Sequence, residues 1–544
     1  MTTAPLEARA ARPVAAAAAV ALSLSLSLSA CAVGPDYRKP STPVAPVYKE
    51  LAGWKAAEPQ DAAPRGPWWS VFGDPVLDRL VRQVDISNQT LKASEASFRQ
   101  ARALVAEARS GLFPTLSASA SARRTGSGGG GGSGSRSGGT STAATATGGT
   151  GSTVILSQTG GGGTYRNQFS TSLGATWDLD VWGRIRRTIE SDVASAQASA
   201  ADLASARLSL QSELAIDYFE LRARDEQQRL LDDAVRAYTQ SFQITRNQYN
   251  AGLAAKADVV TAETQLETTR AQAINVGVQR AQLEHAIAVL TGQPPAQFSL
   301  PPGRLALVVP VAPTGLPSAL LERRPDIAAA ERQVAAANAQ IGVAIAGYFP
   351  DVTLSGSYGF QSSVIDKLFR AANSFWSVGP DAAVSLFDGG LTNAQVEAAH
   401  AAYDQTVANY RQVTLTGFQQ IEDQLATLRI LEQQAEVQAR AVALAREAER
   451  LQLNQYRAGT VPYTSVITAQ QTALSNEETA LSVLESRLVA SVSLVEALGG
   501  GWDASQLPNA ADLNRGNIVP FAHVDEAFGR RPEPSETAPS RPGE

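Results

Sequence analysis

Few residues of this 544-residue chain are of the types that carry chemistry. It has one cysteine, Cys31, and three histidines, His285, His400 and His523, which stand far apart. No two of them have the spacing of zinc ligands, and a single cysteine argues against a disulfide framework. No His-acid pair, nucleophile motif or phosphate-binding loop stands out. The sequence therefore argues against an enzyme, and we expect no metal ion and no bound cofactor.

Cys31 follows a segment whose pattern predicts an export signal. Arg9 and Arg12 form a basic region, and residues 14–28 form an apolar region that leads to small residues before the cysteine. The apolar region has 15 residues with three interspersed serines. It is shorter than the roughly 20 apolar residues that a membrane-spanning helix needs. The segment is therefore expected to be removed from the mature protein.

The residues Leu28-Ser29-Ala30-Cys31 resemble the bacterial lipobox. The motif implies cleavage between Ala30 and Cys31, and an N-acyl group and an S-diacylglycerol on the cysteine. An ordinary signal peptide with a chance cysteine is the alternative, but the one cysteine falls where the motif requires it. Several acyl chains anchor a protein firmly, because each buried CH2 adds about 0.8 kcal/mol. Ala32 follows, whereas Asp there retains lipoproteins in the inner membrane of enteric bacteria, so delivery to the outer membrane is expected.

The charge of the chain is mildly acidic and evenly spread. Its 46 basic and 52 acidic residues give a net charge of -6, and no block of lysine and arginine occurs. Nucleic-acid binding needs a clustered basic footprint. We therefore expect no nucleic-acid partner.

The chain contains an internal duplication. The hexapeptide that begins at Asn247 recurs at Asn454, an offset of 207 residues, and Phe113-Pro114 recurs as Phe349-Pro350 at an offset of 236 residues. The two offsets differ by 29 residues, and residues 126–163 of the first copy are a Gly/Ser/Thr tract with 16 glycines. This tract predicts a flexible insertion. Each half is expected to contain a helix, a strand pair, a very long helix and a return helix.

Four segments, 115–123, 168–179, 351–361 and 376–386, alternate apolar or small residues with polar ones. A half-buried soluble sheet is one interpretation of this pattern. Strands of about 10 residues with aromatic residues near their ends favour a transmembrane barrel. Four strands are too few to close a barrel, and an open sheet edge is not tolerated in lipid. Several chains are therefore expected to share one barrel.

Two segments, 184–250 and 391–457, each run 67 residues without proline, which as helix is about 100 Å. The shorter stretches 75–112 and 258–291 together span about 108 Å, so two short helices are expected beside each long one. The first long segment has apolar residues every three or four positions, as in a coiled coil. These residues are Ile185, Ile189, Val193, Ala196, Ala200 and Leu203.

Each long helix is expected to end at a Tyr-x-x-Gly motif, Tyr249 to Gly252 and Tyr456 to Gly459. Glycine adopts the left-handed conformation that closes a helix C-terminus. A cap alone explains one such motif, but its occurrence at both hairpin tips suggests a docking or gating surface.

Five motifs in the same order on this duplicated scaffold resemble the outer membrane factor family, the TolC-like channels of tripartite efflux pumps, and most closely its lipidated OprM/NodT-type branch. They are Cys31-Ala32-Val33-Gly34-Pro35-Asp36-Tyr37, Pro67-Trp68-Trp69 with Phe72-Gly73-Asp74-Pro75, Trp177-Asp178-Leu179-Asp180-Val181-Trp182-Gly183-Arg184, Leu321-Glu322-Arg323-Arg324-Pro325-Asp326-Ile327, and Leu386-Phe387-Asp388-Gly389-Gly390. The resemblance covers residue 31 to about residue 502.

The resemblance implies an α+β membrane protein: a homotrimer whose 12-stranded transmembrane β-barrel, four strands from each chain, continues into a long periplasmic α-helical barrel. It places the protein in the bacterial outer membrane, lipid-anchored at Cys31 and extending into the periplasm. Its partners would be a periplasmic membrane-fusion adaptor and an inner-membrane RND-type transporter. The expected activity is passive conduction of small toxic compounds or drugs to the exterior.

In relatives the hairpin tips meet the adaptor and close the periplasmic mouth. The resemblance therefore assigns adaptor docking to Tyr249, Gly252, Tyr456 and Gly459, and gating to the second tip. Some relatives carry Asp-Ala-Gln-Arg just inside that tip, where this chain has Thr468-Ala469-Gln470-Gln471. With Tyr456, Thr468 and Gln471 as gate residues, we expect a mouth held by neutral hydrogen bonds, which are weaker than charge-assisted ones, and therefore less dependent on pH and salt.

Arg323, Arg324, Pro325 and Asp326 are expected to have a structural role. Pro325 disfavours helix at Arg324 and suits the first turn of a following helix, and Asp326 favours the positive end of that helix. Packing and capping are the expected functions of this motif. Contact with cargo is not expected.

The expected organisation follows from these signals, in chain order. It comprises a lipoprotein signal peptide (1–30), an extended lipid-anchored segment (31–74), a helix (75–112), a strand pair with an external loop at 126–163 (113–182), a long helix, tip and return helix (183–292), an equatorial linker (293–320), a helix (321–347), a strand pair (348–389), a long helix, tip and return helix (390–499), and an equatorial and disordered tail (500–544).

Two alternatives to an efflux channel stay open. A lipid-anchored envelope coiled coil that conducts nothing would not need the four alternating strands. A channel for type I protein secretion would use the same architecture, and the sequence does not distinguish it.

Overall fold

The computed structural model describes residues 32–42, 44, 48–50, 67–126, 165–305, 309 and 323–513. The predicted signal peptide with Ala30 and Cys31, nearly all of the Gly/Ser/Thr tract and the tail from residue 514 lie outside these residues. The chain divides into two units. One combines Arg109–Arg186 with Ile345–Thr392 and holds the strands, and the other combines Gly34–Ala108, Arg187–Ala344 and residues from Asn393 onward and holds most of the helices.

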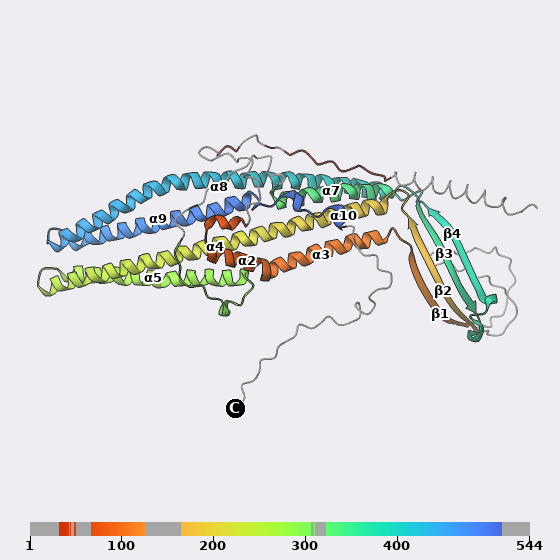
Figure 1. The fold of residues 1–544 in the computed structure, drawn as a ribbon, viewed down its shortest axis with the longest axis horizontal. Coiled ribbons are helices and arrows are strands. Elements are labelled where there is room, and N and C mark those ends of the chain that lie inside the picture. The colour runs from red at the N-terminus through yellow and green to blue at the C-terminus, as the bar shows by residue number, and fades with distance from the viewer. Residues whose placement is uncertain are drawn as a thin grey trace, which may run out of the picture. The chain divides into compact units, whose positions relative to one another are not determined.

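The strand unit is one antiparallel sheet of four strands in the order β1-β2-β3-β4 (Figure 1). The strands are β1 (Thr115–Gly126), β2 (Tyr165–Leu179), β3 (Asp351–Ser362) and β4 (Ser374–Ala383). The second strand of the second copy was expected to reach Leu386, but β4 ends at Ala383, opposite the first residue of β3. Beyond Ala383 no partner strand remains, so the pairing stops although the alternation in sequence continues.

The register gives the sheet one apolar and one polar face. Phe169 of β2 pairs with Ala122 of β1, and Leu173 pairs with Tyr358 of β3, so apolar side chains share one face. On the other face hydroxyl groups meet across the strands, with Oγ to Oγ distances of 2.8–2.9 Å. These pairs are Ser119 with Ser172, Ser121 with Ser170, and Ser357 with Ser377. The alternation in sequence therefore becomes a sheet suited to lipid on one side and water on the other.

Two long helical hairpins form most of the second unit. α4 (Arg184–Asn250) turns into α5 (Lys256–Leu290), and α8 (Leu391–Arg457) turns into α9 (Tyr463–Ala497). Both long helices have 67 residues, the length expected from the two proline-free segments. Figure 1 shows each return helix running beside its long helix. No helix in the described part of the chain combines the length and the apolar character needed to cross a membrane.

The first short helical stretch differs from expectation, because residues 75–112 form two helices instead of one. α2 (Pro75–Ser87) ends at Asn88, whose backbone is extended, and α3 (Gln89–Ser110) begins next to it. The Asn88 side chain accepts a hydrogen bond from the Leu91 N–H (2.9 Å) and donates one to the Leu290 carbonyl (2.8 Å). Asn88 therefore caps α3 and ties the break to the end of α5, because its short amide competes well for backbone groups.

Apolar clusters hold the helices of this unit together. The largest joins α2 and α4 to the ends of α5 and α9, through buried residues such as Leu77, Leu214 and Leu488. A second joins α7 (Pro325–Ala346) to α8 and α9. Part of the predicted coiled-coil stripe also packs as expected, since Val193 and Ala196 of α4 meet Val105 of α3. Each hairpin is thus held by its own contacts and by contacts to the other.

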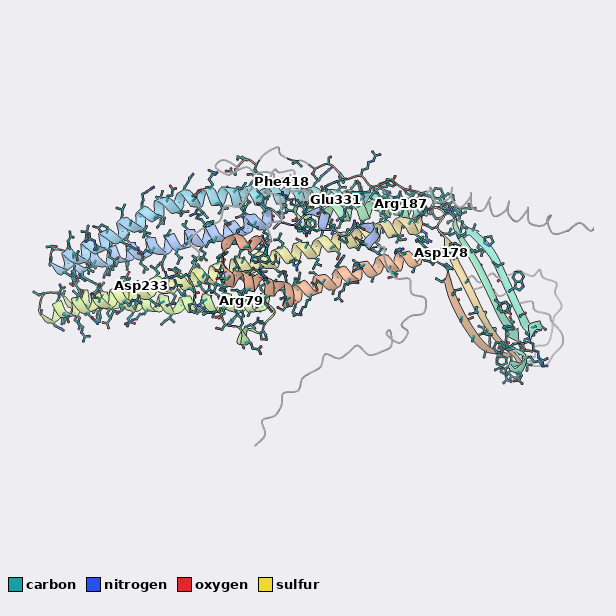
Figure 2. The ribbon with its side chains drawn as sticks, viewed as in Figure 1. Arg79, Asp178, Arg187, Asp233, Glu331 and Phe418 are labelled. Carbon is teal, nitrogen blue, oxygen red and sulfur yellow. The ribbon has the colours of Figure 1, made fainter. Side chains whose placement is uncertain are left out.

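The extended N-terminal segment lies across α4 and α7. Arg187 of α4 donates to the Gly34 carbonyl (3.1 Å) and to Asp36 (3.0 Å), and Tyr37 donates to Glu331 of α7. Figure 2 labels Arg187 and Glu331, two of the helix residues that bind this segment. Burial, together with Glu331, raises the pKa of the Tyr37 hydroxyl, which therefore stays a donor. The segment that would follow a lipid anchor is in this way fixed to the helices of both copies.

Candidate functional site at the hairpin tips

The tip between α4 and α5 closes with a glycine cap. Gly252 has a φ of 76°, its N–H donates to the Tyr249 carbonyl (2.9 Å), and the Leu253 N–H donates to the Gln248 carbonyl (2.8 Å). This pair of hydrogen bonds is the Schellman motif, which needs a left-handed residue at the position of Gly252. Tyr249 is 42% exposed and Leu253 is 80% exposed. The first tip thus presents an aromatic and an aliphatic side chain outward.

The tip between α8 and α9 has the same backbone. Gly459 has a φ of 71°, its N–H donates to the Tyr456 carbonyl (2.9 Å), and the Thr460 N–H donates to the Gln455 carbonyl (3.0 Å). The tyrosine, however, is only 5% exposed here. Its ring packs on that of Tyr463, with centroids 5.2 Å apart. The duplicated motif therefore has one buried and one exposed tyrosine.

Below the second tip, a buried polar network connects α8 and α9 to α4. The Tyr456 hydroxyl donates to Thr245 Oγ1 (3.2 Å), and Gln470 Nε2 donates to Ser241 Oγ (3.1 Å). The Tyr238 hydroxyl donates to the Gln470 carbonyl (3.2 Å). Burial raises the pKa of Tyr456, so it remains protonated and able to donate. Because buried polar groups are costly without partners, this network fixes the second hairpin against the first.

The two other predicted gate residues lie on the first turns of α9 but differ in their contacts. Gln471 Nε2 donates to Gln265 Oε1 of α5 (2.7 Å), a neutral link between the two hairpins. Thr468 donates to the Thr464 carbonyl of its own helix (3.0 Å) and lines a groove between α8 and α9. Of these two residues, only Gln471 therefore forms a hydrogen bond with the other hairpin.

Charged residues that the sequence reasoning missed lie on the same hairpin. Glu449 of α8 has a raised pKa, first because it is partly buried and then because it faces Glu477 of α9. Glu477 forms an ion pair with Arg446. The repeat offers no signal for these residues, because the position equivalent to Glu449 in the first copy is Phe242.

The motif from Arg323 to Asp326 is built around a buried arginine at the start of α7. Arg324 is 8% exposed and donates to both oxygens of Asp326 (3.0 and 2.6 Å) and to the Ala497 carbonyl at the end of α9 (3.0 Å). Asp326 also accepts from the Ile327 N–H (2.8 Å). Pro325 is the first residue of the helix. This geometry is that of a motif that joins a helix start to a neighbouring helix end.

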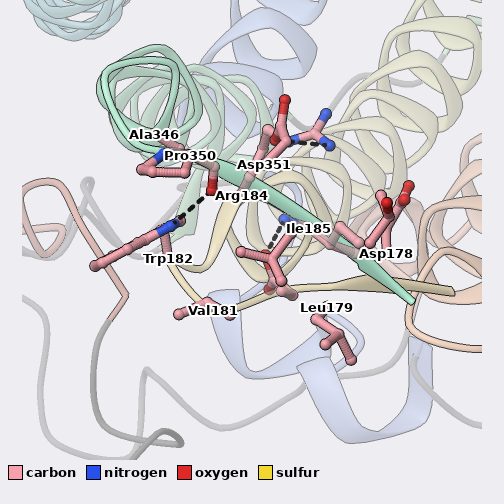
Figure 3. Close-up of a pocket in the computed structure, with 12 residues that line it drawn as sticks. Asp178, Leu179, Val181, Trp182, Arg184, Ile185, Ala346, Pro350 and Asp351 are labelled. Atoms are coloured by element: carbon pink, nitrogen blue, oxygen red, sulfur yellow. Dashed lines mark hydrogen bonds and ion pairs between the residues drawn. The ribbon is translucent and has the colours of Figure 1, made fainter. Parts of the chain in front are cut away.

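In the strand unit, a compact junction connects β2 to the start of α4 (Figure 3). Trp182 Nε1 donates to the Pro350 carbonyl (2.9 Å), and the Trp182 ring stacks on Phe349 with centroids 4.6 Å apart. Arg184 Nη2 lies 3.6 Å from Asp351 Oδ1, so the two side chains form an ion pair. The cavity here holds about 30 Å³, room for a few water molecules and not for an organic ligand. The junction is therefore a structural joint.

Together, an antiparallel sheet with lipid-suited and water-suited faces and helical hairpins of about 100 Å define a channel protein that combines membrane strands with long helices. The chain matches the family described as Outer membrane efflux protein over residues 80–293 and 316–500. The chain belongs to this family. It is an outer-membrane channel of the efflux-pump type that extends into the periplasm, and it is not an enzyme.

Individual relatives match over most of their length. A probable efflux pump outer membrane protein of Pseudomonas putida, TtgC, is 30% identical over 87% of this chain and 93% of its own length. The pyoverdine export outer membrane protein OpmQ of Pseudomonas aeruginosa is 31% identical over 86% and 94%. The solved structure of the outer-membrane channel OprN is 30% identical, with a TM-score of 0.76, and covers 87% of this chain and 100% of that chain. The TolC-like fold and the family resemblance are thereby confirmed.

Proposed function

We propose that three copies of this chain assemble into one channel, with four strands from each copy in a shared 12-stranded barrel. The main support is an unpartnered apolar stripe on α8. Four side chains at seven-residue spacing are 54%, 58%, 72% and 46% exposed: Ile430, Val437, Leu444 and Leu451. A heptad spacing of this kind is typical of a helix that packs against another long helix. Because the stripe is exposed in one chain, its partner would be a helix of a second copy.

The edges of the sheet support the same assembly. Within the described residues β1 and β4 each pair on one side only. Each edge leaves a row of backbone N–H and C=O groups without partners, which lipid does not tolerate. Pairing of β4 with β1 of the next copy would satisfy both rows and close the ring.

The proposed channel is anchored by lipid at Cys31, with N-acyl and S-diacylglycerol groups. Support comes from the lipobox sequence and from the residues that follow it. The Val33 N–H donates to the Trp182 carbonyl (3.0 Å), beside the strand-to-helix junction. A lipid two residues earlier would therefore be tethered close to the ends of β2 and β3, where a membrane surface is expected.

In the proposed pump, the hairpin tips receive a periplasmic adaptor that links the channel to an inner-membrane RND-type transporter. The exposed Tyr249 and Leu253 of the first tip would provide contact surface for the adaptor, and the packed second tip would serve as the gate. Cargo would be small toxic compounds or drugs, moved passively through a lumen lined by the serine-rich face of the sheet. Gly252 and Gly459 would set the shape of the two tips.

The oligomeric state tests the assembly most simply. Full-length protein extracted from outer membranes in mild detergent should scatter light as three chains per particle, after correction for bound detergent. Val437→Arg and Leu444→Arg should weaken the trimer, whereas the matched change Ala439→Arg, at an exposed α8 position outside the stripe, should not. A folded wild-type monomer would contradict the shared barrel, because four strands cannot close a pore.

A further inference from the structure

The apolar face of the sheet carries one charged side chain. The register places Arg124 on the same face as Ala122, Phe169 and Phe360, and no other charged residue of the four strands shares that face. A charge on a lipid-facing surface is costly near the middle of the bilayer and tolerated near its boundary. Arg124 lies two residues from the end of β1, at the sheet end opposite the junction with α4. Its position is therefore at one boundary of the lipid-facing band.

The guanidinium of Arg124 is held in place by an aromatic ring. It lies over the Tyr165 ring, 4.8 Å from the centroid. Tyr165 pairs with Gly126, and a Cβ atom at Gly126 would lie 2.9 Å from the ring atom Cε1. Glycine therefore leaves the space that the ring occupies, and the ring supports the arginine through a cation–π contact. Among the described residues, no carboxylate pairs with Arg124.

The surroundings of Arg124 are basic as well as aromatic. Besides Arg124, the described residues at this end of the sheet, 122–126, 165–168 and 361–374, include four basic residues and one acidic residue, in a chain of net charge -6. Two of the basic residues, Lys367 and Arg370, lie in the β3–β4 connection. Phe369 between them is 73% exposed and packs on Phe360 of the apolar face, with centroids 5.5 Å apart. This connection therefore folds over the lipid-suited side.

We propose that Arg124 binds the phosphate of a lipid headgroup in the outer leaflet. The inference rests on the proposed function in one respect, that the sheet spans the membrane. A guanidinium offers a planar fork of N–H donors that matches phosphate, and a fixed side chain loses little entropy on binding. Aromatic side chains at the same level fit the membrane boundary, where tyrosine is enriched. Arg124 is held by an aromatic ring and has no carboxylate partner among the described residues, so it is suited to bind an anion at this boundary.

The test compares two neighbouring arginines on opposite faces. Arg124→Gln removes the proposed contact, and Arg123→Gln removes the same charge from the polar face, where Arg123 pairs with Gln168. Full-length assembled protein, stripped of lipid, is titrated with hexa-acylated lipid A that carries two phosphates, and bound lipid is counted by native mass spectrometry. We expect binding about tenfold weaker for Arg124→Gln, as the loss of one charge-assisted contact predicts, and nearly unchanged binding for Arg123→Gln. Arg124→Lys should be intermediate.

Each other result would overturn the proposal. Equal lipid A binding by wild type and Arg124→Gln would show that Arg124 is not part of a lipid site. Equal losses of binding in Arg124→Gln and Arg123→Gln would show that lipid A is attracted by net charge and not by the apolar face of the sheet. Wild-type affinity for dephosphorylated lipid A that matches the affinity for lipid A would exclude phosphate recognition. Displacement of lipid A by inorganic phosphate at the same molar concentration would exclude a lipid-specific site. Conductance of Arg124→Gln separates the proposals: an unchanged conductance leaves the channel function standing whatever the lipid result.

Discussion

The two hairpin tips have the same backbone and different environments. Both end a 67-residue helix with a Tyr-x-x-Gly motif and both close it with the same pair of hydrogen bonds. Yet Tyr249 is 42% exposed, whereas Tyr456 is 5% exposed and reaches Thr245 of α4. The difference lies partly in the partner helix, because α4 has Thr245 and Ser241 below the second tip and α8 has Gln452 and Ala448 at the equivalent positions. It lies also in the return helix, because the Tyr456 ring packs on Tyr463 and the first copy has Lys256 at that position.

The two tips therefore share one backbone motif and differ in how their tyrosines pack. The motif preserves the glycine cap at both tips. The residues that surround each tyrosine decide whether its side chain is buried or exposed. We infer that the second tip holds the mouth closed through its contacts with α4 and that the first tip is available to a partner.

Tyr456→Ala should loosen the second tip strongly. Removal of a buried aromatic side chain typically costs about 3–5 kcal/mol, here through lost packing on Tyr463 and the lost hydrogen bond to Thr245. Local opening at Arg457 should then become on the order of 100-fold more frequent, as seen in the rate of trypsin cleavage there. Tyr249→Ala is the matched control and should change the free energy of unfolding by less than about 0.5 kcal/mol. Equal effects of the two substitutions would contradict the comparison.

The two glycines should behave alike, because only the backbone matters to them. Gly252→Ala and Gly459→Ala each place a side chain at a positive φ, with no neighbouring atom close enough to add a clash. Each should destabilise its tip by about 1–2 kcal/mol, measured by hydrogen exchange of the last turn of α4 or α8. A large effect at only one tip would mean that the caps differ.

The hydroxyl contact between Tyr456 and Thr245 should contribute about 1 kcal/mol. A double-mutant cycle of Tyr456→Phe and Thr245→Val, read by hydrogen exchange at the tip, isolates this term. Tyr249→Phe serves as a control without a partner for its hydroxyl among the described residues. Strictly additive effects of Tyr456→Phe and Thr245→Val would show that the contact contributes nothing.

The pH dependence should also differ between the hairpins. The pKa of Glu449 is raised above its ordinary value of 4.5 by burial and by Glu477, while Arg446 and Gln470 act in the opposite direction. An acid with a raised folded pKa favours the folded state while it is protonated, so this contribution is lost as pH rises from 4.5 through the folded pKa. Cleavage at the second tip should therefore slow slightly on acidification, and Glu449→Gln should abolish this trend. Faster cleavage at acidic pH would contradict the assignment.

Gln471→Ala should have the smallest effect, about 0.5 kcal/mol, because its hydrogen bond to Gln265 is exposed and neutral. The double substitution Gln471→Arg with Gln265→Glu replaces it with an ion pair. Conductance of the closed mouth should then become more sensitive to salt than that of wild type. No change in salt dependence would place this link outside the gate.

Much of the fold could be predicted from the sequence, because hydrophobic periodicity and the absence of proline determine secondary structure over short stretches of chain. The bounds of α4 and α8, the four strands and the two glycine caps follow from such local signals. The break at Asn88 could not be predicted, since it depends on a contact with the end of α5 more than 200 positions away. The end of β4 at Ala383 likewise depends on where its partner strand begins.

The candidate site was predicted less completely. The sequence identified both tyrosines as tip residues and the family resemblance assigned Tyr456 to the gate, but their nearly identical motifs gave no sign that one tyrosine is buried and the other exposed. The burial of Tyr456 involves Thr245 on another helix and Tyr463 on the return helix, where the first copy has Lys256, and the tip motif indicates neither contact. Arg124 was hidden for the same reason, as its significance appears only when the register assigns it to the apolar face.

The conductance of single closed channels in planar bilayers tests whether the second tip, and not the first, seals the mouth. Wild type, Tyr249→Ala and Tyr456→Ala would be compared at one voltage and one salt concentration. If only the second tip seals the mouth, wild type and Tyr249→Ala should show a small conductance and Tyr456→Ala a clearly larger one. A larger conductance for Tyr249→Ala with an unchanged one for Tyr456→Ala would contradict it.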